Sequence, residues 1–410
     1  MKKQVNPLIT ATALLVALGA VLFVYTKGLL HKPEPAAGGA AGGGGGGGTD
    51  PPVGLQSVTV STLAGWASPG LVDGTGWTAK FNGPAGLALA PDGSLYVSDS
   101  RNHRIRRVTP AGVVLTVAGS GPVDCLPGGY ADGPAGQARF FNPAGLCAAP
   151  EGTLYIADAG NHRVRQLRDG RVTTIVGRET PKDELGFEQG GRQAGPVAQA
   201  LLKYPVAVAR TPTGELLIAD LGNQALRRLA DGTLTTHALS AMQRLSAPTG
   251  VLVAGSAVFV ADADTPKLAA WEPGGVGPAG NLTGVAPRCP TGLARLPDGS
   301  LVVVDGEWNA VFAVTPSGSS TLLAGVLPAG GPAHGARDGT GAEALFSGAC
   351  AVCAADWTLY VADFGNNCIR KLEIPPDWAT PPPPPLDARQ QRWQQHGRRP
   401  GKRDGDRSAD

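Results

Sequence analysis

The amino-acid sequence predicts an all-β fold, a six-bladed β-propeller closed by its N-terminal strand and preceded by one transmembrane helix. Three observations support this prediction. Six segments repeat a hairpin pattern, in which an apolar run ends in Asp and a short polar turn leads into a second, alternating run. The 410 residues include 60 Gly and 36 Pro but only 5% aromatic residues, as is typical of turn-rich all-β proteins. Residues 8–25 are almost uninterruptedly apolar.

We interpret residues 1–27 as a membrane anchor. At about 1.5 Å per residue, the stretch from Leu8 to Tyr25 nearly spans a hydrocarbon core of about 30 Å. A signal peptide usually has an apolar core of about 7–15 residues followed closely by small residues, whereas here Lys27 and Lys32 follow. We therefore favour an uncleaved, single-pass anchor in the cytoplasmic membrane with the rest of the chain outside. The alternative is a secreted protein released by signal cleavage.

The segments that flank the repeats have no apolar periodicity. Residues 28–56 are a Gly- and Pro-rich linker, and residues 377–410 form a Pro-rich, basic tail. Seven Arg or Lys residues and four Asp residues lie between Leu386 and Asp410. This composition predicts a solvated disordered tail, with contact to an anionic lipid, cell-wall polymer or nucleic acid as the alternative.

The repeats occupy residues 57–376, which we predict to be the propeller. The closing Asp recurs at intervals of 42 to 62 residues, and the shortest interval leaves room for four short strands. The last repeat has no outer strand of its own. The segment "SVTVSTLAG" at residues 57–65 precedes any complete repeat, so we expect it to complete the last blade and close the ring.

The hairpins resemble NHL repeats, a family of β-propellers. The resemblance is strongest in three hairpins with the pattern Y-V-A-D-x-x-N-H-R-I-R, at Tyr96–Arg106, Tyr155–Arg165 and Tyr360–Arg370. A second family pattern, D-G-x-G-x-x-A-x-F, occurs at Asp73–Phe81 and Asp338–Phe346 and more loosely at Asp132–Phe140. The resemblance implies the fold. It leaves the function open, because the family includes scaffolds, sensors, RNA binders and a lyase.

The repeated polar residues are predicted to be architecture. Asp shapes tight turns by bonding its own backbone, so we assign a structural turn role to Asp99, Asp158, Asp220, Asp262, Asp305 and Asp363. His103 and His162 occupy the same position in adjacent repeats. A zinc site needs three or four converging ligands, and equivalent positions on neighbouring blades lie apart. We therefore expect no metal and no other cofactor.

Arginines alternate with apolar residues in the second strand of the hairpins. Alternation in a strand predicts that the apolar set points to the neighbouring blade and that the basic set is solvated, which discourages pairing between molecules. Base stacking would require aromatic residues near these arginines, and the net charge is only +2. We expect no nucleic-acid partner.

Departures from the repeat are better candidates for function. The fifth hairpin carries Glu307 and Trp308 at its turn, and long insertions at residues 120–141 and 178–204 precede the second and third blades. Loops on a rigid scaffold often carry binding residues, and exposed Trp is enriched at interfaces. The binding-face candidates are Arg101, His103, His162, Arg163, Glu307 and Trp308. Ordinary loop drift is the alternative explanation.

The sequence contains no recognisable catalytic motif. The cysteines stand at positions 125, 147, 289, 350, 353 and 368, and Cys350-x-x-Cys353 lies in an apolar stretch that favours core residues or half-cystines over a redox or metal element. We predict a monomeric, non-catalytic module that binds a protein or a surface polymer. The alternative is a metal-dependent lactonase or lyase with its site in the central channel, although the expected inner strands carry almost no metal-ligand chemistry.

Overall fold

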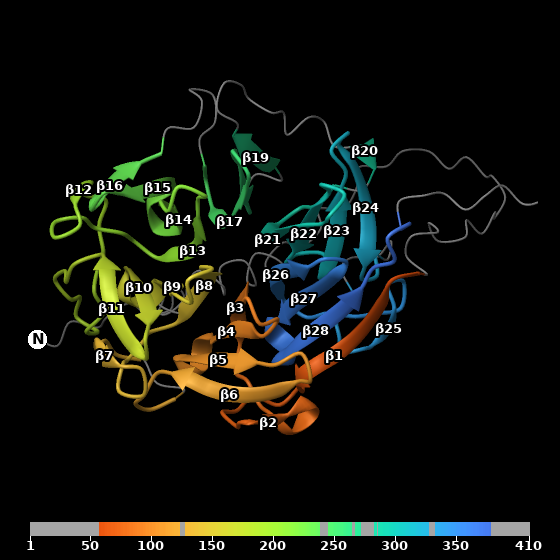
Figure 1. Ribbon diagram of the computed structural model, residues 1–410, viewed down its shortest axis with the longest axis horizontal. Coiled ribbons are helices and arrows are strands. Elements are labelled where there is room, and N and C mark those ends of the chain that lie inside the picture. The colour runs from red at the N-terminus through yellow and green to blue at the C-terminus, as the bar shows by residue number, and fades with distance from the viewer. Residues whose placement is uncertain are drawn as a thin grey trace, which may run out of the picture.

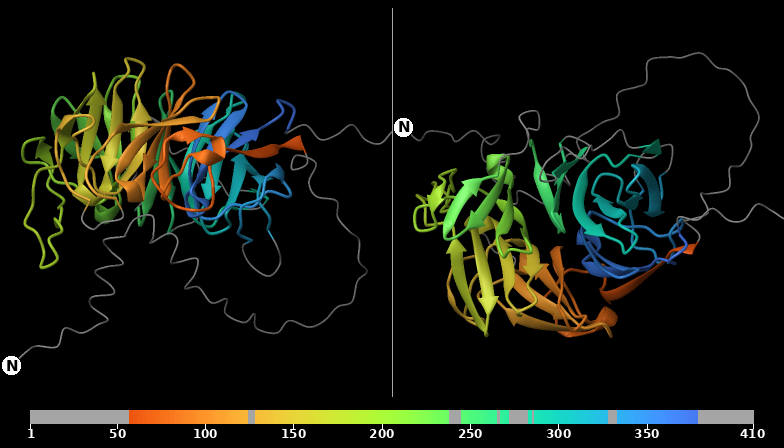
Figure 2. Two further views of the ribbon diagram at one scale, coloured as in Figure 1. Left: turned by 90° about the horizontal axis from the view of Figure 1, so that it is seen from below. Right: turned by 45° about the horizontal axis from the view of Figure 1, so that its top comes forward.

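The computed structural model describes residues 57–123, 128–237, 245–264, 267–271, 283–284, 286–327 and 333–378. Their strands form six sheets arranged as a ring (Figure 1). The strands run between the two ends of this ring, as the side view in Figure 2 shows. The all-β propeller prediction is therefore confirmed.

Five sheets have five strands each, in the order short outer strand, fourth, third, second and first. The first sheet contains β2 (Gly74–Thr75), β3 (Pro84–Leu89), β4 (Leu95–Asp99), β5 (Arg104–Val108) and β6 (Val113–Ala118). The second contains β7 (Gly133–Pro134), β8 (Pro143–Ala148), β9 (Leu154–Asp158), β10 (Arg163–Arg168) and β11 (Arg171–Val176). The third contains β12 (Gly195–Pro196), β13 (Pro205–Arg210), β14 (Leu216–Asp220), β15 (Ala225–Ala230) and β16 (Thr233–Thr236).

The remaining sheets complete the ring. The fourth contains β17 (Pro248–Ala254), β18 (Ala257–Asp262) and β19 (Lys267–Trp271). The fifth contains β20 (Thr283–Gly284), β21 (Pro290–Arg295), β22 (Leu301–Asp305), β23 (Ala310–Val314) and β24 (Ser319–Ala324). The sixth contains β1 (Thr59–Gly65), β25 (Gly339–Thr340), β26 (Ala349–Ala355), β27 (Thr358–Asp363) and β28 (Cys368–Glu373). Short 3-10 turns are η1 (Gly76–Thr78), η2 (Ser100–Asn102), η3 (Ala159–Asn161), η4 (Leu221–Asn223) and η5 (Phe364–Asn366).

The N-terminal strand closes the ring as predicted. Strand β1 pairs antiparallel with β28, the third strand of the last repeat, from Thr59 opposite Glu373 to Gly65 opposite Cys368. Asp338 reinforces this join, because its carboxylate accepts hydrogen bonds from the backbone N–H and the hydroxyl of Thr62, both at 3.0 Å. The last sheet is thus assembled from both ends of the propeller.

The inner strands lie side by side around the centre of the ring. Contacts run from β3 to β8, β13, β17, β21 and β26 and return to β3. Glycine permits this close approach: a Cβ on Gly86 would lie 2.0 Å from the carbonyl oxygen of Ala144, and one on Gly145 would lie 2.6 Å from the Cα of Ala207. A larger residue at either position would force the inner strands apart.

Apolar clusters fill the interfaces between neighbouring sheets. Phe81, Phe140 and Phe346 end the D-G-x-G-type segments and are fully buried, and Leu202 is fully buried ahead of the third sheet. Trp378 is also buried, in a cluster that includes Val58 and Ile374, and its indole N–H donates to Asp298 at 3.3 Å. The packed region therefore includes Trp378, a residue that the sequence assigned to the tail.

The expectation of six equivalent four-stranded blades is wrong. Among the described residues, five sheets are complete, and each has a fifth strand because the segment ahead of its inner strand adds two residues to the outer edge, as β2 does on β6. The fourth sheet has three strands among the described residues. Its repeat has Thr265 and Ala269 where four other repeats have the Asn and Arg that contact the buried Asp.

Some predictions concern residues outside the described ranges. These are the membrane anchor, the linker up to residue 56, the tail from residue 379 and Cys125. Within the residues that the structure does describe, no helix has the length and apolar character needed to cross a membrane.

Candidate functional site

A buried carboxylate ends the second strand of each sheet. Asp99 is inaccessible to solvent and accepts hydrogen bonds from the backbone N–H of Asn82 at 2.7 Å and from the Asn102 amide at 2.8 Å. Its second oxygen also accepts from Arg106 at 2.7 Å. Burial raises the pKa of Asp99 to about 6, which leaves the carboxylate ionised at neutral pH beside its guanidinium partner.

The same Asp–Asn–Arg arrangement recurs in three other sheets. It comprises Asp158, Asn161 and Arg165; Asp220, Asn223 and Arg227; and Asp363, Asn366 and Arg370. In the fourth and fifth sheets the Asp binds backbone N–H groups instead; Asp305, for example, accepts from Cys289 at 2.8 Å and from Trp308 at 2.7 Å. Every one of these carboxylates is used in holding a turn.

The interpretation of the strand arginines as solvated charge is wrong for six of them, of which Arg104 and Arg163 are buried at the start of their strands. Arg106, Arg165, Arg227 and Arg370 are at most 1% exposed. Arg106 also pairs with Asp73 of the D-G-x-G segment at 2.7 Å and lies 5.2 Å from the centre of the Phe81 ring. These guanidinium groups tie the turn, the third strand and the preceding segment together, and they are not free to bind a partner.

His103 and His162 lie at joints between sheets. Both adopt left-handed backbone conformations, with φ of 57° and 56°, at the end of a 3-10 turn. The Nδ1 atom of His103 accepts the backbone N–H of Asn142 at 3.2 Å, and that of His162 accepts the N–H of Tyr204 at 3.0 Å. Each acceptor belongs to one sheet and each donor precedes the inner strand of the next.

Asparagine performs this linkage elsewhere in the ring. Asn309 accepts the N–H of Gly348 at 2.6 Å, and Asn367 accepts the N–H of Gly83 at 2.9 Å. The two histidines are 1% and 2% exposed. Burial lowers the pKa of His162 to about 4, so its ring is neutral at physiological pH.

The other predicted binding residues lie at the same end of the ring but are not gathered into one site. Arg101 is partly exposed and lies over the Phe364 ring at 4.7 Å. Arg163 is buried, pairs with Glu188 at 3.0 Å and lies 4.1 Å from the centre of the Tyr130 ring. Arg163 thus fixes the insertion ahead of the third sheet.

Glu307 and Trp308 form a small cluster with Arg288 at the fifth sheet. The Arg288 guanidinium lies 4.2 Å from the centre of the Trp308 ring and 3.3 Å from the Glu307 carboxylate. Both candidates are half-buried rather than fully exposed. The cluster presents a partly exposed cation held between an aromatic face and a carboxylate.

The sequence pointed to the insertions at residues 120–141 and 178–204 but did not identify the exposed apolar residues that the connecting segments carry. Three connecting segments, residues 66–83, 119–142 and 177–204, join the outer strand of one sheet to the inner strand of the next. Of the seven large hydrophobic residues that are exposed among the described residues, all but Leu115 lie in these connecting segments: Trp66, Val72, Trp77, Val123, Tyr130 and Leu185. Trp77 is 80% exposed, and the corresponding positions of two other repeats hold Gly136 and Ala342. A large aromatic residue at a position that is small elsewhere in the repeat is a feature of the sequence that could have indicated an exposed binding residue.

Hydrogen bonds and ring stacking hold the insertion ahead of the third sheet in place. Asp183 caps its tip by accepting the backbone N–H groups of Leu185 and Phe187. The Phe187 ring stacks on Phe141 with a centroid separation of 5.8 Å. Leu185, 47% exposed, is therefore presented on an ordered hairpin.

Metal-ligating and thiol chemistry is sparse in the described part of the chain. It contains no group of three or more His, Cys, Asp or Glu side chains placed to hold a metal ion. Cys350 and Cys353 are not disulfide-bonded, and burial raises the pKa of the Cys353 thiol to about 12. A thiol held protonated in this way is a poor nucleophile.

Comparison with known proteins agrees with this architecture. A family model for the NHL repeat matches residues 81–108 and 140–167. This protein is an NHL-repeat β-propeller. The propeller is 35% identical over 109 residues to the protein SUPPRESSOR OF QUENCHING 1, chloroplastic, of Arabidopsis thaliana. This alignment covers 25% of this chain and 10% of that protein. It is 38% identical over 101 residues to NHL repeat-containing protein 2 of Gallus gallus, covering 24% and 13%.

Solved structures share the propeller fold over most of the chain. An auxiliary nutrient binding protein from Bacteroides thetaiotaomicron aligns with a TM-score of 0.55 and 16% identity, covering 77% of this chain and 76% of that one. A gluconolactonase from Xanthomonas campestris aligns with a TM-score of 0.52 and 16% identity, covering 80% and 96%. At these identities the likeness of the propeller to both proteins establishes the fold alone.

Proposed function

We propose that this NHL-repeat propeller is a non-catalytic binding module whose three connecting segments bind a protein partner. The observation that carries this proposal is the concentration of exposed large hydrophobic residues in the connecting segments.

We also propose that the propeller has six blades in total. The three-stranded fourth sheet is counted as a blade of its own, because its inner strand β17 lies between the inner strands of the third and fifth sheets.

Exposed apolar groups on these successive connecting segments favour association. Isolated apolar residues are common on protein surfaces, but Trp and Tyr are enriched among residues that dominate binding energy. Trp66, Trp77 and Tyr130 supply three such side chains. The ordered hairpin under Leu185 adds a site that loses little conformational entropy on binding. The cluster of Arg288, Glu307 and Trp308 remains a second contact candidate on the fifth sheet.

The lactonase or lyase alternative has less support. In metal-dependent catalysis the protein holds the ion with carboxylate or imidazole ligands. The inner strands β3, β8, β13, β17, β21 and β26 contain no Asp, Glu or His. Their close approach at Gly86 and Gly145 also leaves no room for added side chains there. The likeness to a gluconolactonase concerns the fold.

For location, we propose that residues 8–25 hold the propeller outside the cytoplasmic membrane. The length of the apolar segment supports this proposal. In the propeller, Thr59 of β1 pairs with Glu373 of β28, so both ends of the described domain leave the same end of the ring. The turns η2 to η5 lie at the other end, where they would face away from an anchor.

The test is a binding measurement on a partner obtained by affinity capture with the propeller as bait. We expect the purified partner to bind Trp66→Ser and Leu185→Ser variants at least tenfold more weakly than the unmodified protein. Leu115→Ser is the matched control, because Leu115 is an exposed apolar residue outside the connecting segments. Unchanged affinity in both test variants, or equal weakening in the control, would refute the proposed surface.

A further inference from the structure

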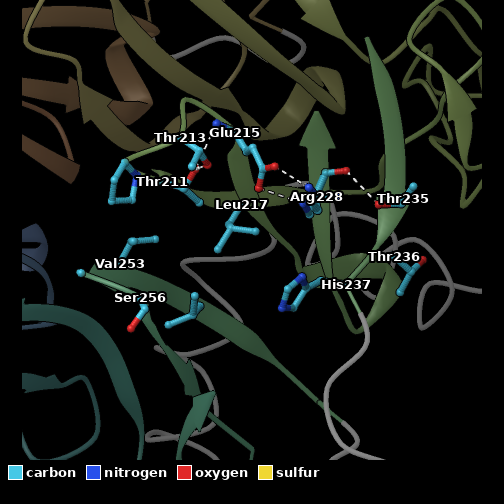
Figure 3. A pocket seen from close by; sticks show the side chains of 13 residues that line it. Thr211, Thr213, Glu215, Leu217, Arg228, Thr235, Thr236, His237, Val253 and Ser256 are labelled. Atoms are coloured by element: carbon cyan, nitrogen blue, oxygen red, sulfur yellow. Dashed lines mark hydrogen bonds and ion pairs between the residues drawn. The ribbon is translucent and has the colours of Figure 1, made fainter. Parts of the chain in front are cut away.

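A pocket of about 750 Å³ lies between the third and fourth sheets, separate from the connecting segments. Its walls include Glu215, Leu217, Arg228 and His237 from the third sheet and Val253 and Val258 from the fourth. Figure 3 shows the side chains of Leu217, Arg228 and His237 facing Val253 and Ser256 across the opening. Pockets of about 300–1,000 Å³ are the usual size for small-molecule sites.

The internal repeat explains why this interface is open. Three residues before the strand-ending Asp, the first, second and sixth sheets carry Tyr96, Tyr155 and Tyr360. Each tyrosine packs in the apolar cluster shared with the following sheet. The third sheet has Leu217 at this position, and Leu217 packs against Val258 of the fourth sheet. The interface therefore lacks the phenol ring that three equivalent interfaces contain.

A second substitution changes the chemistry of the same opening. Leu63, Val117 and Ile175 stand at the bulge of the outer strand in the sixth, first and second sheets, and all three pack into the interface with the next sheet. His237 follows the outer strand β16 at the corresponding position and lines the pocket. An apolar contact is thus replaced by a polar ring.

The pocket walls select for an uncharged ligand. Leu217, Val253 and Val258 provide an apolar floor. The only charged side chains in the lining neutralise each other, because the Arg228 Nε donates to the Glu215 carboxylate at 2.9 Å and a second guanidinium nitrogen also bonds that carboxylate. Burial lowers the pKa of His237, which favours the neutral ring. An added net charge in the ligand would find no unpaired opposite charge in this lining.

We propose that this pocket binds a small, uncharged hydroxyaromatic molecule. The aromatic ring lies against Leu217 and Val258, in the space that Tyr96, Tyr155 and Tyr360 fill in the equivalent interfaces. The hydroxyl group hydrogen-bonds to the polar wall formed by Glu215, Arg228 and Thr213. This site is independent of the protein-binding surface, so either can exist without the other.

The probe is 2-naphthol, whose fluorescence reports binding, titrated into the full-length protein and checked by calorimetry. We expect saturable binding at one site. Leu217→Tyr should weaken it at least tenfold, because the new ring fills the pocket as it does in the sister sheets. Leu115→Tyr adds a tyrosine on an exposed strand position and should leave the affinity unchanged. If Leu217→Tyr does not fold, as judged by circular dichroism, Val258→Phe fills the pocket from the opposite wall.

The ligand class is tested with two analogues. 2-Methoxynaphthalene lacks the hydroxyl donor and should bind about tenfold more weakly, while anionic 2-naphthoate should bind more weakly still. The proposal is overturned by an absence of saturable 2-naphthol binding, by full affinity in both pocket-filling variants, or by preference for the anion.

Discussion

Protonation of His162 should contribute to destabilising the propeller in acid, and replacing it with asparagine should remove that contribution. The Nδ1 atom of His162 accepts the Tyr204 N–H at 3.0 Å, and its Nε2 lies 2.8 Å from the carbonyl oxygen of Glu188. Both contacts are satisfied only by the neutral ring protonated on Nε2. A second proton would place an N–H against the N–H of Tyr204.

The direction and size of the effect follow from the two pKa values. The pKa of His162 is about 4 in the folded protein, against 6.5 for an ordinary histidine. The unfolded chain therefore takes up a proton between these values that the folded protein does not. The contribution of His162 to the free energy of unfolding is fully present above pH 6.5 and decreases as the pH drops toward 4. The decrease is about 3 kcal/mol, since each pH unit of difference corresponds to about 1.4 kcal/mol.

The assay is urea unfolding followed by tryptophan fluorescence at pH 7, 6, 5 and 4. His162→Asn keeps an acceptor for the Tyr204 N–H, as Asn309 and Asn367 do in their own sheets, and carries no titrating group. The variant should lose about 3 kcal/mol less than the unmodified protein between pH 7 and pH 4. Gln224→Asn, at the equivalent non-titrating position, should not change the pH profile. Parallel pH profiles for the unmodified protein and His162→Asn would refute the reasoning.

Three other outcomes are expected. Asp99→Asn should destabilise the protein by about 3–5 kcal/mol, because it leaves the buried Arg106 without its carboxylate. Asp92→Asn disrupts an exposed ion pair and should leave stability almost unchanged; chemical denaturation measures both variants. Deleting residues 57–65 should lower the melting temperature of the whole propeller, since the sixth sheet loses β1, and an unchanged value would contradict the closure. Full-length protein should fractionate with membranes; a mature soluble form beginning near Ala40 would show that the anchor is a signal peptide.

The repeat pattern was sufficient to predict the strand-forming segments and the closing strand. An apolar run ending in Asp, followed by a short turn, corresponds to β4 and β5 and to their equivalents around the ring. The role of residues 57–65 followed from the missing outer strand of the last repeat. Both conclusions depend on local sequence pattern and on the need to pair every sheet edge.

The burial of the strand arginines could not be predicted in the same way. Alternation shows which side of a strand a residue occupies, but in a propeller both sides of a sheet face neighbours. Arg106 is buried because Asp99, seven residues earlier, and Asp73, in a separate segment, provide its charge partners. The insertions were recognised as candidates, but their exposed residues were not, because the exposure of Trp66 and Leu185 depends on how the connecting segments fold over the sheets.

The closure by β1 also sets how the propeller responds to mechanical force. Its two ends meet at the Thr59–Glu373 pair, and β1 and β28 run antiparallel from there. Tension applied through the chain ends therefore loads the hydrogen bonds of this pair one after another instead of together. A pull on both ends should unzip the sixth sheet at low force and release the ring from that seam, while the other sheets keep their strands continuous in sequence.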